Sequence, residues 1–486
     1  MLILVMLLGI GLRSPELLNR NPLFGFDQGR DYLAVRKIVV EKKLTLIGAE
    51  VGAGMAGLQY LFHGPYYYYS LVIPFALFGG DPYGGLVLMF AFGVASLFLC
   101  FYFVWKSFGF KMALIATLLA GVALSAQSRF MWNSHPSPLF ILLVFWSTFK
   151  IPQNPRKYFF WACFWAGIIY GFQLAISVAL LASLFLFAIF IAKIKKLAIY
   201  FLGMAGMVLA YLPFFAFEAR HGLMAFKSVG NLFFNLLNRK TSLNFLATFK
   251  DHRLSFWFNF RDTFYLSDQW RGWLAIFLLV AIIYYLIKQK RSPEKDFIAF
   301  LFILPLVTFL IFIFLNSPVW GHYLVHLHLA YILLFAFLAT KTKISVVKVI
   351  FFVFLIAMLP LIFKECQKAY ADLGDYGGEA KLKGKIEAVD YLYQDAGGEK
   401  FNVLVFTPPV YDYAYRYFLT WYGGKKYGYI PGDKKEGLFY LWIEQDSKKP
   451  WSYEGWLETV IKEGEILKEE KLPSGFIIQK RYVEKK

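Results

Sequence analysis

Charged residues are scarce in this chain: only 17% of its 486 residues are Asp, Glu, Lys or Arg, while 58% are hydrophobic. Ordinary soluble domains carry about 25% charged residues. Instead of charge, the chain has repeated uncharged apolar runs, and a bilayer-spanning helix needs roughly 20 apolar residues. The composition therefore excludes an ordinary soluble protein and predicts a polytopic α-helical membrane protein.

Acidic residues are especially few in the first 363 positions. The net charge of +19 belongs entirely to this part, because 20 basic and 20 acidic residues balance each other from Lys364 onward. A basic excess can indicate nucleic acid as a partner, but basic residues that flank membrane spans are the commoner cause. We therefore expect contact with membrane lipids and no binding of nucleic acid.

Cysteine is almost absent. Cys100, Cys163 and Cys366 lie far apart, so the sequence has no metal-ligand spacing of cysteines and no evident disulfide framework. The apolar start, residues 1–12, also lacks the basic n-region and the small-residue cleavage site of a signal peptide. We interpret it as a first transmembrane helix that continues toward Leu18 or starts before the sequence given.

The apolar runs predict about 11 transmembrane helices when this first segment is counted. The others cover about 84–105, 112–128, 134–149, 158–174, 176–192, 197–217, 272–287, 297–315, 322–340 and 344–363. The uncharged stretch 158–192 is read as two short helices with a break near Gln173 to Ser177. Residues 66–80 are apolar but short and contain Pro74, so they predict an interfacial or re-entrant segment.

Basic residues gather in one set of alternate loops. That set holds 14 Lys and Arg residues against Glu294 and Asp296, whereas the short loops of opposite parity carry only Arg129. By the positive-inside rule the N-terminus is cytoplasmic. The protein is then a multi-pass protein of the cytoplasmic membrane, with external loops at about 19–83 and 218–271.

The character of the sequence changes at Lys364. EAKLKGKIEAVDYLYQ (379–394) has the periodicity of an amphipathic helix, and FNVLVFTP (401–408) that of a strand. YDYAYRYFLTWYG predicts another helix, and LFYLWIEQ and GFIIQKRYV predict further strands. The chain thus divides into a transmembrane domain, 1–363, and a small extracytoplasmic α/β domain, 364–486.

Two motifs have plain structural explanations. Gly52 to Gly57 matches GxGxxG, but a dinucleotide site needs this motif between a strand and a helix, and here it lies in an external loop. His322, His326 and His328 have a spacing seen among metal ligands, but they open an apolar helix and do not share one face. We predict no metal site there, and expect His322 and Tyr323 to line an aqueous cavity.

A set of polar residues recurs in the first external loop and at the outer ends of the predicted spans. Asp27 and Asp31 are four residues apart, so a helix would bring both carboxylates to one face beside Arg30. The other members are Arg129, Asn133, His135, Glu218, Arg220 and His221. Individually each residue is more often an interfacial anchor. Together they predict a cavity with carboxylates for proton transfer and cations for an anionic group.

Five segments occur in an order that resembles that of a known family. They are FDQGRD, HGPYYYY, SRFMWNSHP, LPFFAFEARHG and WGHYLVHLHLAY. In this respect the chain resembles the GT-C class of membrane glycosyltransferases, specifically the protein-O-mannosyltransferase-like family that includes the lipid A aminoarabinose transferases. The resemblance covers nearly the whole membrane region. The segment FNVLVFTPPVYDYAYRYFLTWYG is similar to the soluble part of bacterial relatives.

The resemblance implies an inverting transfer of a sugar from a polyprenyl-phosphate donor to a lipid, glycan or protein acceptor at the outer membrane face. Asp27, at the family's acidic position in the first loop, is implied as the general base for the acceptor hydroxyl. Arg30, Arg129 and Arg220 are implied as cations that neutralise the departing phosphate. Tyr66 and Tyr67, with the two tyrosines that follow, are implied as rings that stack on the sugar or the prenyl chain.

One departure from the family concerns the second carboxylate. Many relatives carry two adjacent acidic residues in this loop, whereas Gln28 follows Asp27 here. Asp31, one helical turn later, is the candidate replacement. Some members of the class use a divalent cation and others do not, so a divalent cation stays open as a cofactor.

Two other functions remain open from the sequence. A lipid-linked saccharide transporter or flippase would also have many spans and a polar cavity, but it would more often show polar residues near the midplane and paired half-helices. An O-antigen ligase or polymerase would use an undecaprenyl-pyrophosphate donor and has a different external loop.

Overall fold

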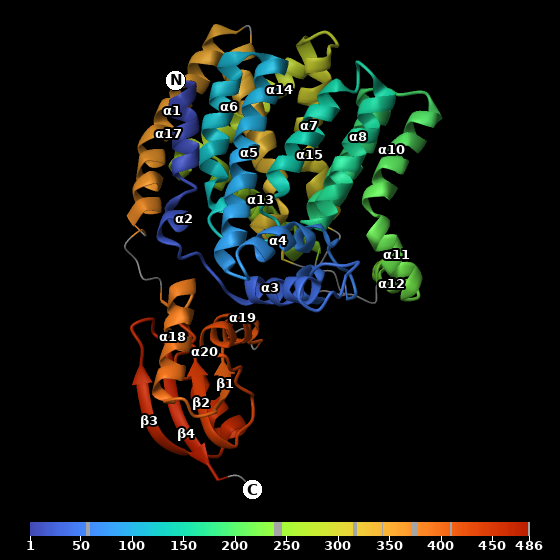
Figure 1. Cartoon of the computed structure of the whole chain (residues 1–486). Coiled ribbons are helices and arrows are strands. Elements are labelled where there is room, and N and C mark those ends of the chain that lie inside the picture. Colours follow the sequence, from blue (N-terminus) through green and yellow to red (C-terminus); the bar gives the residue numbers. More distant parts are fainter. Residues whose placement is uncertain are drawn as a thin grey trace.

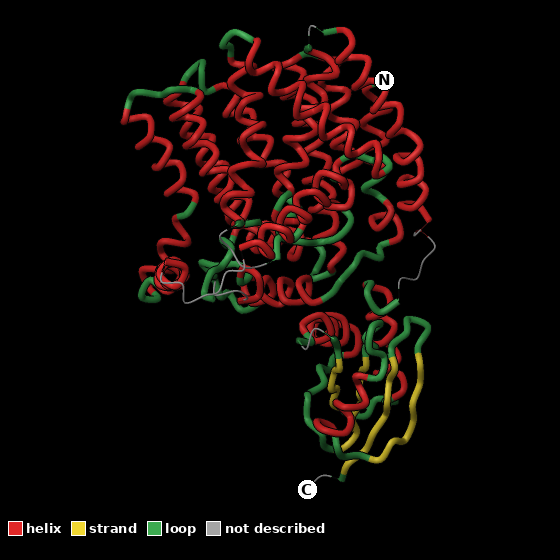
Figure 2. The backbone as a smooth tube through the Cα atoms, turned by 180° about the vertical axis from the view of Figure 1, so that it is seen from behind, coloured by secondary structure: helices red, strands yellow, loops and turns green. Residues whose placement is uncertain are grey.

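The computed structural model describes residues 1–54, 59–237, 245–313, 318–342, 344–371, 373, 378–408 and 411–484. A large block of helices forms one part, and a smaller block with a four-stranded sheet lies at one end of it (Figure 1). The view from behind shows that the strands are confined to the smaller block (Figure 2). The expected combination of a helical membrane part and a small C-terminal α/β part is therefore observed.

The helices of the large block follow the predicted apolar runs closely. They are α1 (Leu2–Gly11), α2 (Pro15–Asn19), α3 (Phe26–Val39), α4 (Tyr66–Leu77), α5 (Pro82–Phe108), α6 (Phe110–Ala123), α7 (Ser137–Lys150), α8 (Pro155–Ile168), α9 (Leu174–Leu186), α10 (Leu197–Ala210), α11 (Leu212–Arg220), α12 (Met224–Leu237), α13 (Phe245–Thr263), α14 (Asp268–Lys288), α15 (Pro293–Phe312), α16 (Val325–Lys341) and α17 (Ser345–Ala371). Short turns of 3-10 or π helix are η1 (Val51–Gly54), η2 (Ser125–Ser128), η3 (Ile169–Gly171), η4 (Phe187–Ile191) and η5 (Gly321–Tyr323).

Within the described residues, 5 of these segments are long and apolar enough to cross a membrane, or up to 6 if a bent pair counts as one span. They are α5, Leu174–Ile191, α14, α15 and α17, with α10 and α11 as the pair. Shorter apolar helices are α1, α6, α7 and α16. The prediction of a helical membrane protein is confirmed, while the count of about 11 crossing helices stays a prediction.

Two breaks interrupt the helical pattern of the bundle. The predicted break in 158–192 is found slightly earlier, because α8 ends at Ile168 and α9 begins after Gln173. The span predicted as one piece over 197–217 is bent by 66° between α10 and α11. Pro213 stands in the first turn of α11, and its missing N–H removes the hydrogen bond that would continue the helix.

The segment 218–271, expected as an external loop, contains helices that pack on the bundle. Asn259 and Thr263 of α13 bind the two ring nitrogens of His328 on α16, at 3.0 and 2.7 Å. His326 lies 2.9 Å from the hydroxyl of Thr308 on α15. These histidines therefore join helices. The described residues contain no group of three or more His, Cys, Asp or Glu that could hold a metal ion, so no metal site is found at the histidine spacing.

The smaller block is an α/β unit whose sheet has the order β1-β2-β4-β3. Its elements are α18 (Leu382–Asp395), β1 (Asn402–Phe406), α19 (Tyr413–Phe418), η7 (Leu419–Gly423), α20 (Gly424–Tyr427), β2 (Gly437–Ile443), α21 (Ser452–Trp456), η8 (Leu457–Ile461), β3 (Glu465–Lys471) and β4 (Ile477–Val483). The strand β2 is buried along its whole length. It pairs in parallel with β1 and antiparallel with β4. Every helix and strand predicted for this part is present.

The two parts share one hydrophobic core. Phe24 and Tyr32 at α3 belong to the same buried cluster as Phe418 and Trp442 of the C-terminal part. At Gly29 the backbone of α19 comes so close that an added Cβ would lie 2.3 Å from the backbone nitrogen of Ala414. The C-terminal part is thus docked directly on α3.

Candidate active site at the end of the bundle

The candidate site is built on α3, which lies across the end of the bundle that faces the C-terminal part (Figure 1). The side chain of Gln28 accepts a hydrogen bond from the backbone N–H of Gly25 at 2.9 Å, and this closes the first turn. Its amide also donates to the carbonyl of Met131 at 2.6 Å. Gln28 stands at the position where many relatives have a second acidic residue, and here it stabilises the first turn of α3 and its contact with Met131.

Asp27 and Asp31 lie on one face of α3 and share Arg30, as their spacing predicts. Nη1 of Arg30 lies 2.8 Å from Oδ1 of Asp27. Nη2 and Nε both lie 2.8 Å from Oδ1 of Asp31. The two carboxylates differ in access to solvent, because 36% of the Asp27 side chain is exposed against 2% for Asp31.

Burial gives Asp31 unusual chemistry. Its Oδ1 accepts a further hydrogen bond from the hydroxyl of Tyr68 at 3.2 Å, while Oδ2 is buried and has no hydrogen-bond partner among the described residues. Burial raises the pKa of Asp31 to about 6, against the lowering effect of the Arg30 guanidinium. Asp31 is therefore a buried anion at neutral pH that holds Arg30, and Asp27 is the carboxylate open to a substrate.

Three histidines of the candidate site are held in their neutral form. Burial lowers the pKa of His63 to about 3, and the nearby charge of Arg30 and the His322 ring lower it further. Burial likewise lowers the pKa of His135 to about 3 and that of His322 to about 4. His63 also accepts a hydrogen bond from the backbone N–H of Leu174 at 3.2 Å through Nδ1, which leaves Nε2 to carry the proton.

His63 was not among the residues singled out from the sequence. Its signal was available, because it opens the segment HGPYYYY, just before α4. Its neighbour Gly64 packs on the Tyr170 ring and on Gly171, where an added Cβ would come within 3 Å. The loop before α4 is thus fixed tightly enough to position His63.

The loop before α7 closes another side of the site. Asn133 donates to the carbonyl of Phe172 at 2.7 Å, and Nδ1 of His135 lies 2.7 Å from the carbonyl of Phe130. The Trp132 ring packs on His322 with the centroids 4.4 Å apart. This aromatic contact joins the loop to η5.

Tyr323 of η5 is close enough to Asp27 to sense its charge. Its pKa is raised by burial and then by the negative charge of Asp27. Tyr67 is buried and its pKa is raised well above the ordinary value by burial, followed by the charge of Asp31. Tyr66 binds the carbonyl of Ala210 through its hydroxyl at 2.6 Å. The structure thus brings Tyr67 of α4 near Asp31 and Tyr323 of η5 near Asp27.

Four predicted members of the cavity make their contacts elsewhere. Arg129 forms a bidentate ion pair with Glu16 of α2, at 2.5 and 2.7 Å. Glu218 is buried, and its Oε2 accepts from the backbone N–H of Ala225 at 2.9 Å at the start of α12. Arg220 is exposed at the end of α11, and His221 stacks on Phe217 with the centroids 4.0 Å apart.

The arrangement offers proton transfer and anion binding, but few metal ligands. Asp27 and Asp31 are the carboxylates of the site, and the described residues provide no third His, Cys, Asp or Glu in a metal-binding group with them. A divalent cation would therefore need oxygen atoms from a substrate to complete its ligands.

Comparison with known proteins gives a likeness of fold. No protein-family model matches the chain, and no curated protein sequence matches it. The crystal structure of ArnT from Cupriavidus metallidurans bound to undecaprenyl phosphate is similar, with a TM-score of 0.55 and 13% identity, and the match covers 98% of this chain and 96% of that chain. This match shows the fold, and the resemblance to GT-C glycosyltransferases is confirmed at that level.

Two further solved structures are more distant in shape. ArnT from the same organism in the apo state has 13% identity and a TM-score of 0.47, with 98% of this chain and 96% of that chain covered. The apo form of the oligosaccharyltransferase from Archaeoglobus fulgidus has 14% identity and a TM-score of 0.49, with 86% and 63% covered.

Proposed function

We propose, from the premise that this chain has the fold of a GT-C glycosyltransferase, that it transfers a sugar from a polyprenyl-phosphate donor to an acceptor hydroxyl. The observation that carries the proposal is the partly exposed Asp27 carboxylate, bound to Arg30, at the end of an apolar helical bundle. The related ArnT structure contains undecaprenyl phosphate. A prenyl chain would lie against the apolar helices, with its phosphate and sugar at this end.

Asp27 is the general base in this proposal. It takes the proton of the acceptor hydroxyl while the hydroxyl oxygen bonds to the anomeric carbon. The bond from that carbon to the donor phosphate breaks, and its electron pair leaves with the phosphate. Direct displacement from the opposite face inverts the anomeric configuration. The exposure of Asp27 suits this role, because an acceptor must reach the carboxylate.

Arg30 is the first candidate for neutralising the departing phosphate. Asp31 holds its Nε and Nη2, so Nη1 is the part that can exchange Asp27 for a phosphate oxygen. Arg129 would have to leave Glu16 to act in the same way. Arg220 would act from the end of α11. Phe217, in the same helix, packs on Phe62, which precedes His63 in the sequence.

The neutral histidines suit a sugar better than an anion. A neutral imidazole offers one N–H donor and one acceptor, which matches sugar hydroxyls, while a protonated ring would compete with Arg30 for the phosphate. His63 lies within the influence of the Arg30 charge and of His322, and Tyr323 lies within that of the Asp27 charge. We assign the sugar hydroxyls to them, and the partly exposed ring of Tyr66 to the sugar or the first prenyl units.

The proposed location is the outer face of the cytoplasmic membrane. The loops with the basic excess join α5 to α6, α7 to α8, η4 to α10, α14 to α15 and α16 to α17. They belong to the end of the bundle opposite α3, where Figure 1 also has the N-terminus. With the basic end in the cytoplasm, Asp27 and the C-terminal part face outside.

The test is transfer by the purified full-length protein with a panel of radiolabelled polyprenyl-phosphate sugars, run beside a flipping assay in liposomes with the same lipids. We expect transfer of the label from at least one donor, with inverted anomeric configuration in the product. Flipping of these lipids without any transfer would contradict the proposal and favour a transporter. Transfer from pyrophosphate-linked donors alone would favour the ligase alternative.

A further inference from the structure

A cavity lies between the C-terminal part and the first turn of α3. It encloses about 270 Å³. Phe26 and Gln28 line it from the membrane part, and Lys385, Tyr411 and Glu444 line it from the C-terminal part. Neither part forms this cavity alone.

Two side chains, Phe26 and Arg30, link the cavity to the proposed base. Phe26 lines the cavity, and the Arg30 guanidinium lies 5.7 Å from the centre of its ring. Arg30 is in turn bound to Asp27. Gln28, on the other side of Asp27 in the sequence, also lines the cavity. A molecule held there would therefore contact the turn of α3 that carries Asp27.

Charge and hydrogen-bonding groups converge on the wall formed by the C-terminal part. Lys385 is only 2% exposed, and its ammonium group donates to the carbonyl of Glu379 and lies 5.5 Å from the centre of the Tyr415 ring. Burial lowers the pKa of Lys385 to about 8. Glu444 accepts from the hydroxyls of Thr407, at 2.6 Å, and Tyr415, both through Oε2. Its Oε1 remains for another donor.

We infer that this cavity binds one neutral sugar unit of the acceptor, through Lys385, Glu444 and the rings of Tyr411 and Phe26. This inference rests on the proposed function and names the acceptor class. Hydroxyl groups can donate to Glu444 and accept from Lys385, and the apolar face of a sugar ring can lie on Tyr411 or Phe26, which pack together with centroids 5.7 Å apart.

Charge and size both favour a neutral monosaccharide unit. One ammonium and one carboxylate line the cavity, so a free anion would gain Lys385 but face Glu444 at the same time. The volume of about 270 Å³ is slightly below the usual range of ligand pockets, roughly 300–1,000 Å³. The cavity thus fits one unit, with the rest of the acceptor outside.

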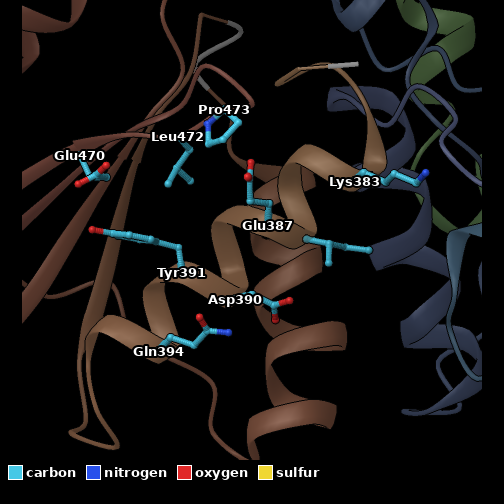
Figure 3. A pocket seen from close by; sticks show the side chains of 9 residues that line it. Lys383, Glu387, Asp390, Tyr391, Gln394, Glu470, Leu472 and Pro473 are labelled. Atoms are coloured by element: carbon cyan, nitrogen blue, oxygen red, sulfur yellow. The ribbon is translucent and has the colours of Figure 1, made fainter. Parts of the chain in front are cut away.

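Figure 3 shows a second pocket, of about 550 Å³, on another side of α18. It is lined by Glu387, Asp390, Tyr391, Gln394 and Glu470 among others, and its described lining comes from the C-terminal part alone. Asp390 is already engaged there by Lys426 and Tyr427, at 2.8 Å each. This pocket has no described link to Asp27, and it supplies a control.

The test measures binding of methyl glycosides by saturation-transfer NMR to the full-length protein in nanodiscs, with no donor present and no glycoside detergent. We expect saturation transfer to at least one neutral methyl glycoside. Lys385→Met and Glu444→Gln should each weaken this binding roughly tenfold, the loss of one hydrogen bond to a charged group. Gln394→Ala, on the same helix but in the pocket of Figure 3, should leave it unchanged.

Unchanged binding in both variants, or binding of inorganic phosphate in place of neutral glycosides, would contradict the inference. Unfolding temperatures measured alongside identify a variant that fails to fold. Displacement of the bound glycoside by a soluble oligosaccharide or by a membrane glycolipid would support the site and identify the source of the sugar unit. No displacement by either would overturn the acceptor assignment.

The two proposals can fail separately. Glycoside binding that depends on Lys385 and Glu444, without transfer from any donor, would keep the cavity assignment and reject the proposed function. If transfer occurs and neither substitution changes the KM for the acceptor, the proposed function is kept and the cavity assignment is rejected.

Discussion

At the scale of residues, Asp27 and Asp31 bind the same guanidinium, that of Arg30, but differ in burial. Arg30 is held by Asp31 through two nitrogens and by Asp27 through one. Asp31 is buried, and Asp27 is partly exposed. We therefore interpret Asp31 as the positioning residue for Arg30 and Asp27 as the catalytic residue.

This division predicts a pH dependence. The pKa of Asp31 is raised to about 6, so Asp31 is charged at neutral pH and takes up a proton as the pH falls through about 6. Protonation weakens its hold on Arg30, and kcat should fall along this acid limb. In Asp31→Asn the limb near pH 6 should be absent and kcat lower at neutral pH. An unchanged limb in this variant would contradict the role of Asp31.

Replacing each of the three arginines implied as phosphate ligands should have a different effect. Arg30→Gln should raise the donor KM and lower kcat, together costing about 10²-fold or more in kcat/KM, because it removes a charge-assisted contact to the leaving phosphate. Arg129→Gln also breaks the pair with Glu16, so its unfolding temperature should fall. Comparing donor KM and thermal unfolding for these two variants and Arg220→Gln tests the assignment. A larger kinetic effect at Arg220 than at Arg30 would shift the phosphate site toward α11.

The sequence was sufficient to predict the ion cluster, because its members are spaced three and four residues apart on one helix. It was not sufficient to predict the partner of Arg129, which lies 113 positions away. His63 was missed for a similar reason, since its neighbours Arg30 and His322 come from distant segments. Contacts within one helix follow from its period, whereas contacts between segments depend on the whole fold.

At the scale of elements, the close packing of α3 on α19 should control both stability and activity. Gly29→Ala would bring a Cβ within 2.5 Å of backbone atoms of Tyr413 and Ala414. Neither backbone can move without shifting its helix, so we expect a loss of about 1–3 kcal/mol in stability and reduced transfer. Thermal unfolding and hydrogen exchange of α19 measure this effect.

Gly272→Ala is the matched control, because nothing lies within 4 Å of its added Cβ in α14. Gly272 is partly exposed, and its replacement by alanine should be neutral or stabilise by up to about 1 kcal/mol. Equal effects of the two substitutions would contradict the importance of the α3–α19 contact.

Elements with a clear hydrophobic period were predicted correctly, and those without one were missed. The strand β3 has the sequence EILKEEK and is exposed at every position, so it is held by pairing with β4 and carries no buried face. Its charges protect the edge of the sheet. Likewise α13 has low hydrophobicity in its sequence, yet Asn259 and Thr263 bind it to α16.

At the scale of the whole molecule, the proposed orientation can be tested with single cysteines. Cys100 and Cys163 are buried and Cys366 is partly exposed, so Cys366→Ser is a suitable background. In intact cells an impermeant thiol reagent should label Lys43→Cys, in the exposed loop after α3, and should label Lys195→Cys only after lysis. The opposite pattern would contradict an external Asp27. Gln28 is unsuitable for this purpose, because it is buried and closes the first turn of α3.

The predicted division at about residue 364 reflects a change in sequence composition, but the two parts pack around a shared core. The sequence changes character there, because the apolar runs end. The structure shows one core that includes Phe24 and Tyr32 together with Phe418 and Trp442. Sequence composition reports where a chain enters a membrane, and it carries little information on which surfaces dock afterwards.

The central claim is that Asp27 is the base of a transfer reaction, and donor turnover tests it most directly. Purified wild type, Asp27→Asn and the control Glu41→Gln, an exposed acid just after α3, are compared with the donors that the wild type uses. We predict that Asp27→Asn folds normally and loses about 10²- to 10⁴-fold in kcat, while Glu41→Gln keeps wild-type transfer. Wild-type transfer by folded Asp27→Asn would contradict the account.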